Sequence, residues 1–275
     1  MGLAEWRLPC SGEQALRLAA WVGAEGVQLE FGGPGRGGWA DAPGRVGALL
    51  ETSSATGVAL LAVAGNVLND LGLAASPGGR TESRVRRVLV RLLDTARELH
   101  VPLVLVPSFR RSAIDGPRAF ARTARLLAWA AAEAGARGLL LASENVLADE
   151  DARALVEKVA SQAFRLALDT YNPVTVGLDA ARLVKALGPA LADQVHLKDG
   201  PPAVGDMPAL GMGTARLEET LAALGAQRHP VRALVLENDY RDGRAGRIAA
   251  DLAWARAAAA RHRLATADQT RGTGP

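Results

Sequence analysis

The sequence contains few of the residues on which several large classes of protein depend. It has one cysteine, Cys10, in 275 residues, which excludes an internal disulfide and a cluster of thiolate zinc ligands. It has no run of five or more basic residues, and its 32 Lys and Arg against 29 Asp and Glu leave a net charge of only +3. This balance argues against a dedicated nucleic-acid-binding protein.

Long uninterrupted apolar segments are absent as well. No stretch of about 18 apolar residues is free of charges or helix breakers, so we expect no transmembrane helix. The N-terminus lacks the basic segment and apolar run of a secretory signal peptide. We therefore expect a soluble, cytoplasmic protein whose partner is a small molecule, with no nucleic acid and no membrane involved.

What the sequence does contain is an alternation of short apolar runs with longer segments of helical periodicity. Eight runs are predicted as strands: Glu5–Pro9 (the weakest), Gly26–Phe31, Val58–Ala64, Pro102–Pro107, Gly138–Ser143, Arg165–Asp169, Gln194–Lys198 and Val231–Glu237. Helical segments are predicted near residues 11–24, 43–54, 81–99, 115–135, 149–160, 178–188, 214–224 and 243–262. Ser11, with Gln14 three residues later, and Thr81 are the expected helix start signals.

This alternation predicts an α/β fold of one (β/α)8 TIM barrel. The strands are almost wholly apolar, as expected where helices cover a parallel sheet. An open doubly wound sheet is the alternative, but no glycine-rich dinucleotide fingerprint follows the early strands. A chain of 275 residues suits a barrel of about 250 residues. We assign residues 1–263 to the barrel and 264–275, which are polar and non-periodic, to a disordered tail.

Polar residues end four consecutive predicted strands, where such barrels carry their chemistry. These residues are Glu144, Asp169, His196 and Glu237. A lone carboxylate buried after an apolar run is costly without a partner, and a metal ion supplies one. Three carboxylates and one imidazole suit one divalent ion, with Mn²⁺, Mg²⁺ or Co²⁺ favoured and Zn²⁺ possible. The competing interpretation is a structural polar cluster, in which each residue caps a helix, pairs with an arginine or fills the core.

Several segments resemble the xylose-isomerase-like sugar isomerase/epimerase superfamily. They are Gly138–Val146 (GLLLASENV), Leu166–Pro173 (LALDTYNP), Val195–Gly200 (VHLKDG), Leu210–Thr214 (LGMGT) and Leu234–Tyr240 (LVLENDY). The resemblance implies that the four matched positions bind a divalent metal, often Mn²⁺. It also implies that Glu144 and Glu237 act as a general acid/base pair on opposite faces of a bound ketose. Lys198 could donate to the developing oxyanion, or could simply pair with Asp199 or Glu237.

Two departures argue against a ketohexose 3-epimerase. Such enzymes usually have a histidine three residues after the metal aspartate, where this chain has Asn172. They also usually have an arginine shortly after the histidine ligand, where this chain runs Gly200-Pro201-Pro202. The abasic-site endonucleases of the same fold use a histidine-rich three-metal cluster, whereas only one of the four histidines here ends a strand.

Further residues are candidates for binding substrate at the mouth of the barrel. We assign this role to Glu30, Asn66, Ser108, Asn172 and Arg241, the last because barrels often bind phosphate after strand eight. Trp39 could stack on a ring. The segment Gly200–Gly213 could fold over the substrate as a lid, or could be a plain surface connection.

Three functions follow, in order of preference. The first is a metal-dependent isomerase or epimerase that abstracts a proton beside the carbonyl of a small sugar, sugar phosphate or polyol. The second is a metal-dependent dehydratase acting on a keto-inositol or dehydroshikimate-like ring, which needs an added acid such as Lys198. The third is a repurposed barrel in secondary metabolism. The resemblance also implies a possible homo-oligomer, a dimer or tetramer.

Overall fold

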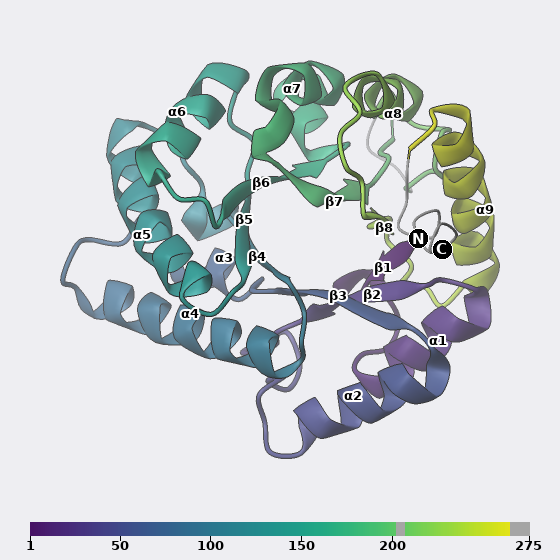
Figure 1. Ribbon diagram of the computed structural model, residues 1–275, viewed down its shortest axis with the longest axis horizontal. Helices are drawn as coiled ribbons and strands as arrows, with labels where there is room; N and C mark the ends of the chain where they lie inside the picture. The colour runs from purple at the N-terminus through teal and green to yellow at the C-terminus, as the bar shows by residue number, and fades with distance from the viewer. Residues whose placement is uncertain (202–206, 265–275) are drawn as a thin grey trace, which may run out of the picture.

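Eight parallel strands close into one barrel in the computed structural model, which describes residues 1–201 and 207–264. The strands form the central ring of Figure 1 in sequence order. They are β1 (Gly2–Ala4), β2 (Gly26–Glu30), β3 (Ala59–Ala64), β4 (Leu103–Pro107), β5 (Leu140–Glu144), β6 (Phe164–Asp169), β7 (Leu191–Leu197) and β8 (Ala233–Leu236). The predicted (β/α)8 barrel is confirmed.

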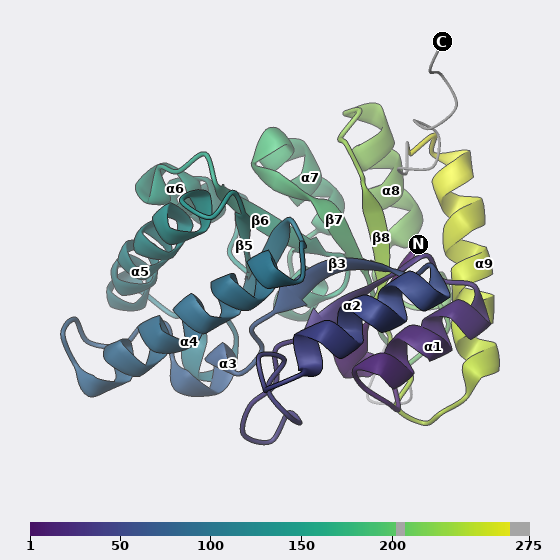
Figure 2. The same cartoon turned by 60° about the horizontal axis from the view of Figure 1, so that its bottom comes forward.

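Helices surround this ring in Figures 1 and 2. In the described ranges they are α1 (Glu13–Val22), α2 (Arg45–Thr56), α3 (Leu68–Leu71), α4 (Arg80–Glu98), α5 (Pro117–Gly135), α6 (Asp149–Val159), α7 (Ala180–Leu187), α8 (Leu217–Ala226) and α9 (Ala245–Arg261). Short 3-10 helices occupy Glu5–Arg7, Arg110–Ser112, Asn172–Val176 and Gly188–Ala190. The helix α3 and these 3-10 turns, too short to show a period, were not predicted.

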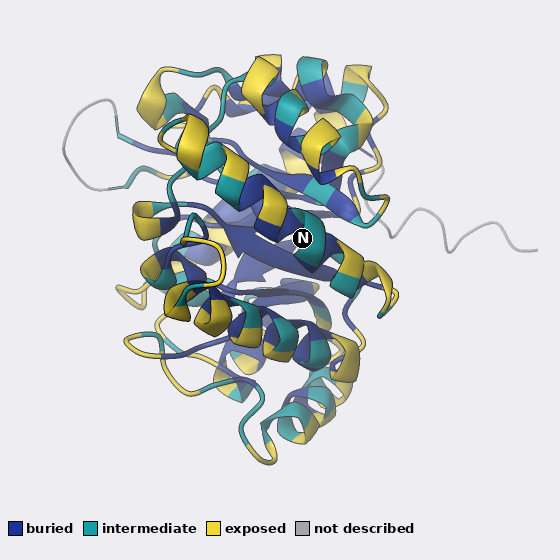
Figure 3. Ribbon diagram, turned by 90° about the vertical axis from the view of Figure 1, so that its left-hand side faces the viewer, coloured by how far each residue is buried: buried dark blue, intermediate teal, exposed yellow. Residues whose placement is uncertain are grey.

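The core has two layers because strand side chains alternate between the inside of the barrel and the helices. Inside, small residues dominate one cluster, formed by Ala62, Ala64, Leu103, Leu105, Ala142, Ala167 and Ala192. Outside, the other strand side chains pack against the apolar faces of the helices. Figure 3 shows the strands as buried and the outer faces of the helices as exposed.

The first strand is shorter and earlier than predicted. Residues Gly2–Ala4 pair with β2 and β8, whereas the predicted strand Glu5–Pro9 begins with a 3-10 turn. The Glu5 carboxylate is buried and accepts the backbone N–H of Gly12 at 2.7 Å and of Glu30 at 2.7 Å. The predicted strand Glu5–Pro9 was wrong, because the sheet pairing ends at Ala4 and the backbone turns at Glu5–Arg7.

Glycine, not Ser11 or Thr81, precedes the two helices whose starts were predicted from side-chain caps. The residue before α1 is Gly12 and the residue before α4 is Gly79, and neither helix has a side-chain cap. The capping box predicted at Ser11 and Gln14 was therefore wrong, and Thr81 lies in the first turn of α4 rather than before it.

A register shift lies between β2 and β3. Val27 pairs with Leu60 and Gln28 pairs with Ala62, so Leu61 is passed over. The Leu61 side chain packs instead with the interior residues of a small cluster next to β1 and β8. Gly2 and Gly26 make room for it, because a Cβ would lie 2.5 Å from Leu61 Cδ1 at Gly2 and 2.7 Å from its Cγ at Gly26. The bulge thus brings one extra residue into the barrel and leaves Leu61 without a pairing partner in β2.

The barrel closes where its first and last strands meet. Gly2 pairs with Val235 and Leu3 with Leu236, and α1 and α9 lie side by side over this seam in Figures 1 and 2. Leu264, which we placed in the tail, is buried in the outer core. Residues 265–275 of the predicted tail lie outside the described residues.

Candidate metal centre and active site

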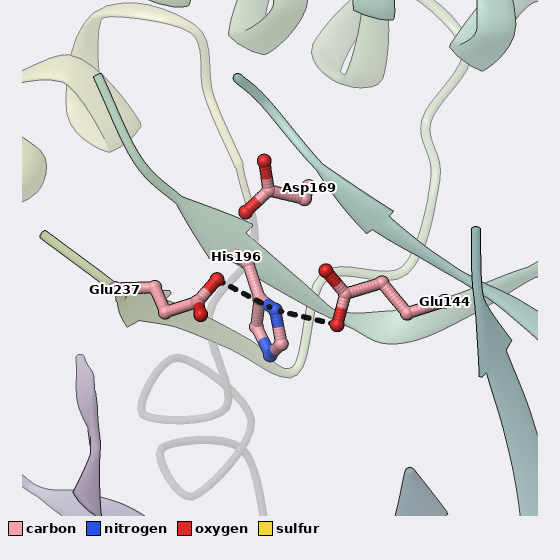
Figure 4. A group of neighbouring side chains, drawn as sticks. All are labelled: Glu144, Asp169, His196 and Glu237. Carbon is pink, nitrogen blue, oxygen red and sulfur yellow. Dashed lines mark ion pairs between the residues drawn. The ribbon is translucent and has the colours of Figure 1, made fainter. Parts of the chain in front are cut away.

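Four side chains meet at the carboxyl ends of the last four strands. Glu144 ends β5, Asp169 ends β6, His196 lies one residue before the end of β7, and Glu237 directly follows β8. One ligand atom from each lies within 4.8 Å of all the others, and all four residues are buried. In Figure 4 the imidazole lies between the two glutamates. We refer to these residues as the four-residue cluster.

The four-residue cluster has buried polar atoms that no protein group satisfies. Within the described ranges, five buried side-chain atoms lack a hydrogen-bond partner, and three of them are Asp169 Oδ2, His196 Nδ1 and Glu237 Oε2. The His196 Nδ1 atom lies 3.4 Å from Glu237 Oε2 and 3.6 Å from Glu144 Oε2. Buried unsatisfied atoms are expensive unless an ion or ligand compensates them. Three carboxylates and one imidazole nitrogen facing one point therefore fit a divalent cation.

Burial and neighbouring charges shift the pKa values of the four-residue cluster in opposite directions. Burial raises the pKa of Asp169 to about 7, and nearby carboxylates add to the shift. Burial also raises the pKa of Glu144. Burial opposes ionisation of Glu237 too, yet Lys198 and the His196 ring hold the pKa of its carboxyl well below its ordinary value. The pKa of His196 rises to about 9, because the surrounding carboxylates outweigh the burial that alone would lower it. Protons thus partly compensate the negative charge that a cation would neutralise.

Glu237 is held from across the barrel seam. Its Oε1 atom accepts Trp6 Nε1 at 2.8 Å and Arg7 Nε at 3.2 Å, with Arg7 Nη2 at 3.1 Å. Its Oε2 atom remains directed at the cluster. Trp6 and Arg7 follow β1, and sequence reasoning missed them because it placed the first strand over these residues.

The candidate for ring stacking, Trp39, instead packs on Phe31 at 5.2 Å between ring centroids.

Asn172 joins Glu144 to Lys198. Its Nδ2 atom donates to Glu144 Oε1 at 2.7 Å, and its Oδ1 atom accepts Lys198 Nζ at 3.0 Å. Lys198 is buried, and its Nζ atom lies 3.9 Å from Glu237 Oε2. One neutral amide therefore bonds to both a carboxylate of the four-residue cluster and the neighbouring ammonium group.

The cluster opens into a cavity of about 390 Å³, within the range of small-molecule sites. Two carboxylates, Glu144 and Glu237, border this main cavity. Five basic residues also border it, namely Arg7, Arg36, Arg110, Lys198 and Arg241. Each of these basic groups also lies near a carboxylate, from Glu237, Glu30, Asp70 or Asp239.

The predicted substrate-binding residues are divided between the main cavity, a neighbouring cavity and the interior. Asn66, Asn172 and Arg241 line the main cavity. Glu30 lines a neighbouring cavity and accepts Asn66 Nδ2 at 2.8 Å, and burial raises the pKa of its carboxyl to about 7. Ser108 is buried with its Oγ atom 3.5 Å from Ser143 Oγ.

Part of the segment proposed as a lid is firmly anchored. The Asp199 carboxylate accepts the backbone N–H groups of Gly211, Gly213 and Ala215 at 2.9–3.0 Å. Residues 202–206 of the predicted lid lie outside the described residues, and the lid stays a prediction.

Comparisons with known proteins agree with this architecture. A family model described as xylose isomerase-like TIM barrel matches residues 16–258. The chain belongs to this family. The predicted superfamily is therefore confirmed.

None of the helices in the described ranges is long and apolar enough to cross a membrane.

Within the xylose isomerase-like family, one relative is similar over almost the whole chain. It is a 2-epi-5-epi-valiolone 7-phosphate 2-epimerase from Actinoplanes sp., 59% identical over 259 residues, or 94% of each chain. Its class, an isomerase, is the class predicted from the sequence.

Two solved structures share the fold. A xylose isomerase domain protein from Planctomyces limnophilus is 16% identical, with a TM-score of 0.76 over 96% of this chain and 97% of its own. A D-psicose 3-epimerase from Clostridium cellulolyticum is 15% identical, with a TM-score of 0.73 over 94% and 98%.

Proposed function

We propose that this protein is a divalent-metal-dependent epimerase that inverts a carbon beside the carbonyl of a phosphorylated, cyclic polyhydroxyketone. The observation that carries the proposal is the pair Glu144 and Glu237, which face each other across the four-residue cluster with buried, unsatisfied ligand atoms between them. The substrate in the name of the Actinoplanes relative, 2-epi-5-epi-valiolone 7-phosphate, is the first compound to test.

Glu144, Asp169, His196 and Glu237 would hold the cation. Mn²⁺ suits this oxygen-rich set best, and Mg²⁺, Co²⁺ and Zn²⁺ are the alternatives. A bound divalent cation supplies Lewis acidity that stabilises the negative charge developing on the carbonyl oxygen.

The two glutamates exchange the proton. One carboxylate removes the C–H proton beside the carbonyl, and the C–H electron pair moves into an enediolate. The other carboxylate returns a proton to the opposite face, which inverts the carbon. The two carboxyls differ in pKa: Lys198 and His196, with Arg7, hold the pKa of Glu237 well below its ordinary value, whereas burial raises the pKa of Glu144. This difference makes Glu144 the more basic of the two.

Lys198 supplies a donor next to the reacting carbon. Its ammonium group lies in the main cavity, oriented by Asn172 at 3.0 Å. A fixed, buried cation there can donate to the enediolate oxygen or to a neighbouring hydroxyl as charge develops.

The arginines at the rim favour a phosphorylated substrate. Arg36 donates to Asp70 through Nε at 3.2 Å and Nη2 at 3.0 Å, and Arg110 Nη1 lies 3.2 Å from the same carboxylate. Arg36 Nη1 also lies 3.9 Å from Glu30 Oε2. The N–H donors of the two guanidinium groups that these carboxylates leave free suit a phosphate monoester.

Turnover in D₂O tests the two-glutamate mechanism. With Mn²⁺ and the ketone phosphate, we expect the wild type to form the epimer with one deuterium at the inverted carbon, observed by NMR. Glu144→Gln and Glu237→Gln should each lose at least about 100-fold in epimerisation rate. Each variant should still exchange the proton of only one of the two epimers, the one whose hydrogen faces the remaining carboxylate.

A matched control and the contrary outcomes complete the test. Glu157→Gln, on the exposed face of α6, should behave as the wild type. Wild-type epimerisation by either glutamine variant, in protein shown to contain metal, would contradict the mechanism. A product that has lost water would favour the dehydratase, and metal binding without turnover would favour a repurposed barrel. A cytoplasmic homo-oligomer, dimer or tetramer, remains an expectation.

A further inference from the structure

A chain of buried hydrogen bonds runs through the inside of the barrel from His196 to the backbone of β3. His196 Nε2 lies 2.8 Å from Gln28 Oε1, and Gln28 Nε2 donates to Gln194 Oε1 at 2.9 Å. Gln194 Nε2 then donates to the carbonyl oxygen of Leu61 at 2.9 Å. Both glutamines are fully buried, at 0% and 1% exposure, so no water competes for their amides. We call Gln28 and Gln194 the glutamine relay.

The direction of the relay follows from its last member. The carbonyl of Leu61 can only accept, so the NH₂ group of Gln194 must face it. The oxygen of Gln194 is then left to accept the NH₂ group of Gln28. The oxygen of Gln28 must in turn accept a hydrogen from His196, which places that hydrogen on Nε2 and leaves Nδ1 for the four-residue cluster.

The acceptor at the end of these hydrogen bonds lies at the bulge in β3. Leu61 is passed over in the pairing of β2 with β3, where Val27 pairs with Leu60 and Gln28 with Ala62. Its carbonyl oxygen accepts Gln194 Nε2 at 2.9 Å inside the barrel. A backbone carbonyl has two lone pairs, so it can accept this bond whatever its pairing within the sheet.

We propose that the glutamine relay is a positioning device that fixes the tautomer of His196, so that Nδ1 rather than Nε2 binds the metal. The inference rests on the metal site of the proposed function. Gln28 and Gln194 touch neither the main cavity nor the other three cluster residues by any hydrogen bond within the described ranges. Their role is to orient the ligand, since a histidine bound to metal usually donates its other N–H to a fixed acceptor.

The glutamine relay predicts that a substitution of Gln194 changes Mn²⁺ binding through Gln28. Replacing Gln28 by methionine removes the acceptor for Nε2–H. Replacing Gln194 by methionine leaves His196 and Gln28 intact but removes what orients the Gln28 amide. That amide can then turn its NH₂ group toward His196, which favours the tautomer with hydrogen on Nδ1 and blocks the ligand atom.

Mn²⁺ affinity, measured by the EPR signal of the free ion without any turnover, tests this. We expect Gln28→Met to weaken Mn²⁺ binding about 10- to 100-fold, the usual effect of losing such a partner, and Gln194→Met to weaken it about tenfold. Thr123→Val is the matched control, because Thr123 is buried in α5, its hydroxyl has no partner and it lies outside the relay. The melting temperature of each metal-free variant separates a folding defect from a ligand defect.

Several results would overturn the inference. A folded Gln28→Met variant with wild-type Mn²⁺ affinity would do so. Weaker Mn²⁺ binding by Gln28→Met together with unchanged Mn²⁺ binding by Gln194→Met would also do so. Failure of the wild type to bind Mn²⁺ would instead remove the proposed function.

A measurement on the wild type covers the case in which the variants do not fold. In the Zn²⁺-loaded protein, long-range ¹H–¹⁵N correlation should show hydrogen on Nε2 of the single buried, metal-bound histidine. Hydrogen on Nδ1 would overturn the relay.

Discussion

Asn172 donates through Nδ2 to Oε1 of Glu144 at 2.7 Å. The sequence placed Asn172 among the substrate-binding residues, and it does line the main cavity. The hydrogen bond adds a second role, because the amide sets which oxygen of Glu144 is free to face the cluster and the substrate. A residue that differs from the histidine of ketohexose 3-epimerases is thus part of the proton-transfer machinery proposed for this chain.

Substitution of Asn172 should change the rate more than metal binding. In Asn172→Ala both Glu144 and Lys198 lose a fixed partner, so we expect kcat to fall about 10- to 100-fold with near wild-type Mn²⁺ content. In Asn172→Asp a second carboxylate beside Glu144 would raise the pKa of Glu144 further, and the acid limb of the pH–rate profile should move to higher pH. An unchanged profile in Asn172→Asp would show that Glu144 does not limit the rate.

Metal binding should release protons and strengthen as the pH rises. The metal binds deprotonated ligands, whereas the pKa values of Asp169 and His196, about 7 and about 9, leave both largely protonated below neutrality. We therefore expect the Kd for Mn²⁺ to fall steadily from about pH 6 to about pH 9, with about one or more protons released near neutral pH. Calorimetry in buffers of different ionisation enthalpy measures the release. An affinity independent of pH would contradict the proton occupancy of the cluster.

Loss of the rim arginines should weaken binding of the phosphate group. Removing one charged hydrogen-bonding group costs about 1.5–3 kcal/mol, so Arg36→Gln and Arg110→Gln should each raise KM for the ketone phosphate by about tenfold or more. The Kd for inorganic phosphate, a competing probe, should rise in parallel, and kcat should change less. Arg118→Gln, exposed on α5 and outside the cavity, is the control. Equal turnover of the dephosphorylated ketone would show that the enzyme does not need the phosphate.

Glu82 should contribute to stability only above acidic pH. It is buried on α4 and accepts Arg125 of α5 at 2.6 Å and Arg86 at 3.0 Å. Burial opposes its ionisation, but these hydrogen bonds and one from Gly78 lower the pKa of its carboxyl to about 2.

A carboxyl whose pKa is lower in the folded protein stabilises the fold above its unfolded pKa, and this contribution is lost as the pH falls toward the folded value. Glu82→Gln should therefore lower the free energy of unfolding by about 1–3 kcal/mol at neutral pH. The difference from the wild type should shrink between about pH 4.5 and about pH 2. Urea denaturation at a series of pH values measures it. A difference that is constant with pH would rule out the charged interaction as its source.

The sequence predicted the barrel and its four cluster residues because both depend on local pattern. Glu144, Asp169, His196 and Glu237 each end or closely follow an apolar run, and the ends of parallel strands must meet at one rim. The same reasoning could not identify Gln28, because the sequence alone does not show which distant residues a glutamine within an apolar run will bond to. Its partners lie 166 and 168 residues away.

Other features could not be predicted because they depend on a departure from regularity. Leu61 gives no sign in the sequence that β3 skips one residue or that its carbonyl accepts the last bond of the relay. Trp6 and Arg7 were missed for a related reason. The first strand ends after three residues, and the following 3-10 turn, too short for any period, carries both side chains to Glu237.

The bond between Trp6 and Glu237 spans 231 positions of the chain. Trp6 follows β1, whereas Glu237 follows β8. A chain cut off before Glu237 lacks both the partner of Trp6 and one member of the four-residue cluster. We therefore expect such a chain, even with seven of the eight strands present, to bind Mn²⁺ more weakly than the closed barrel.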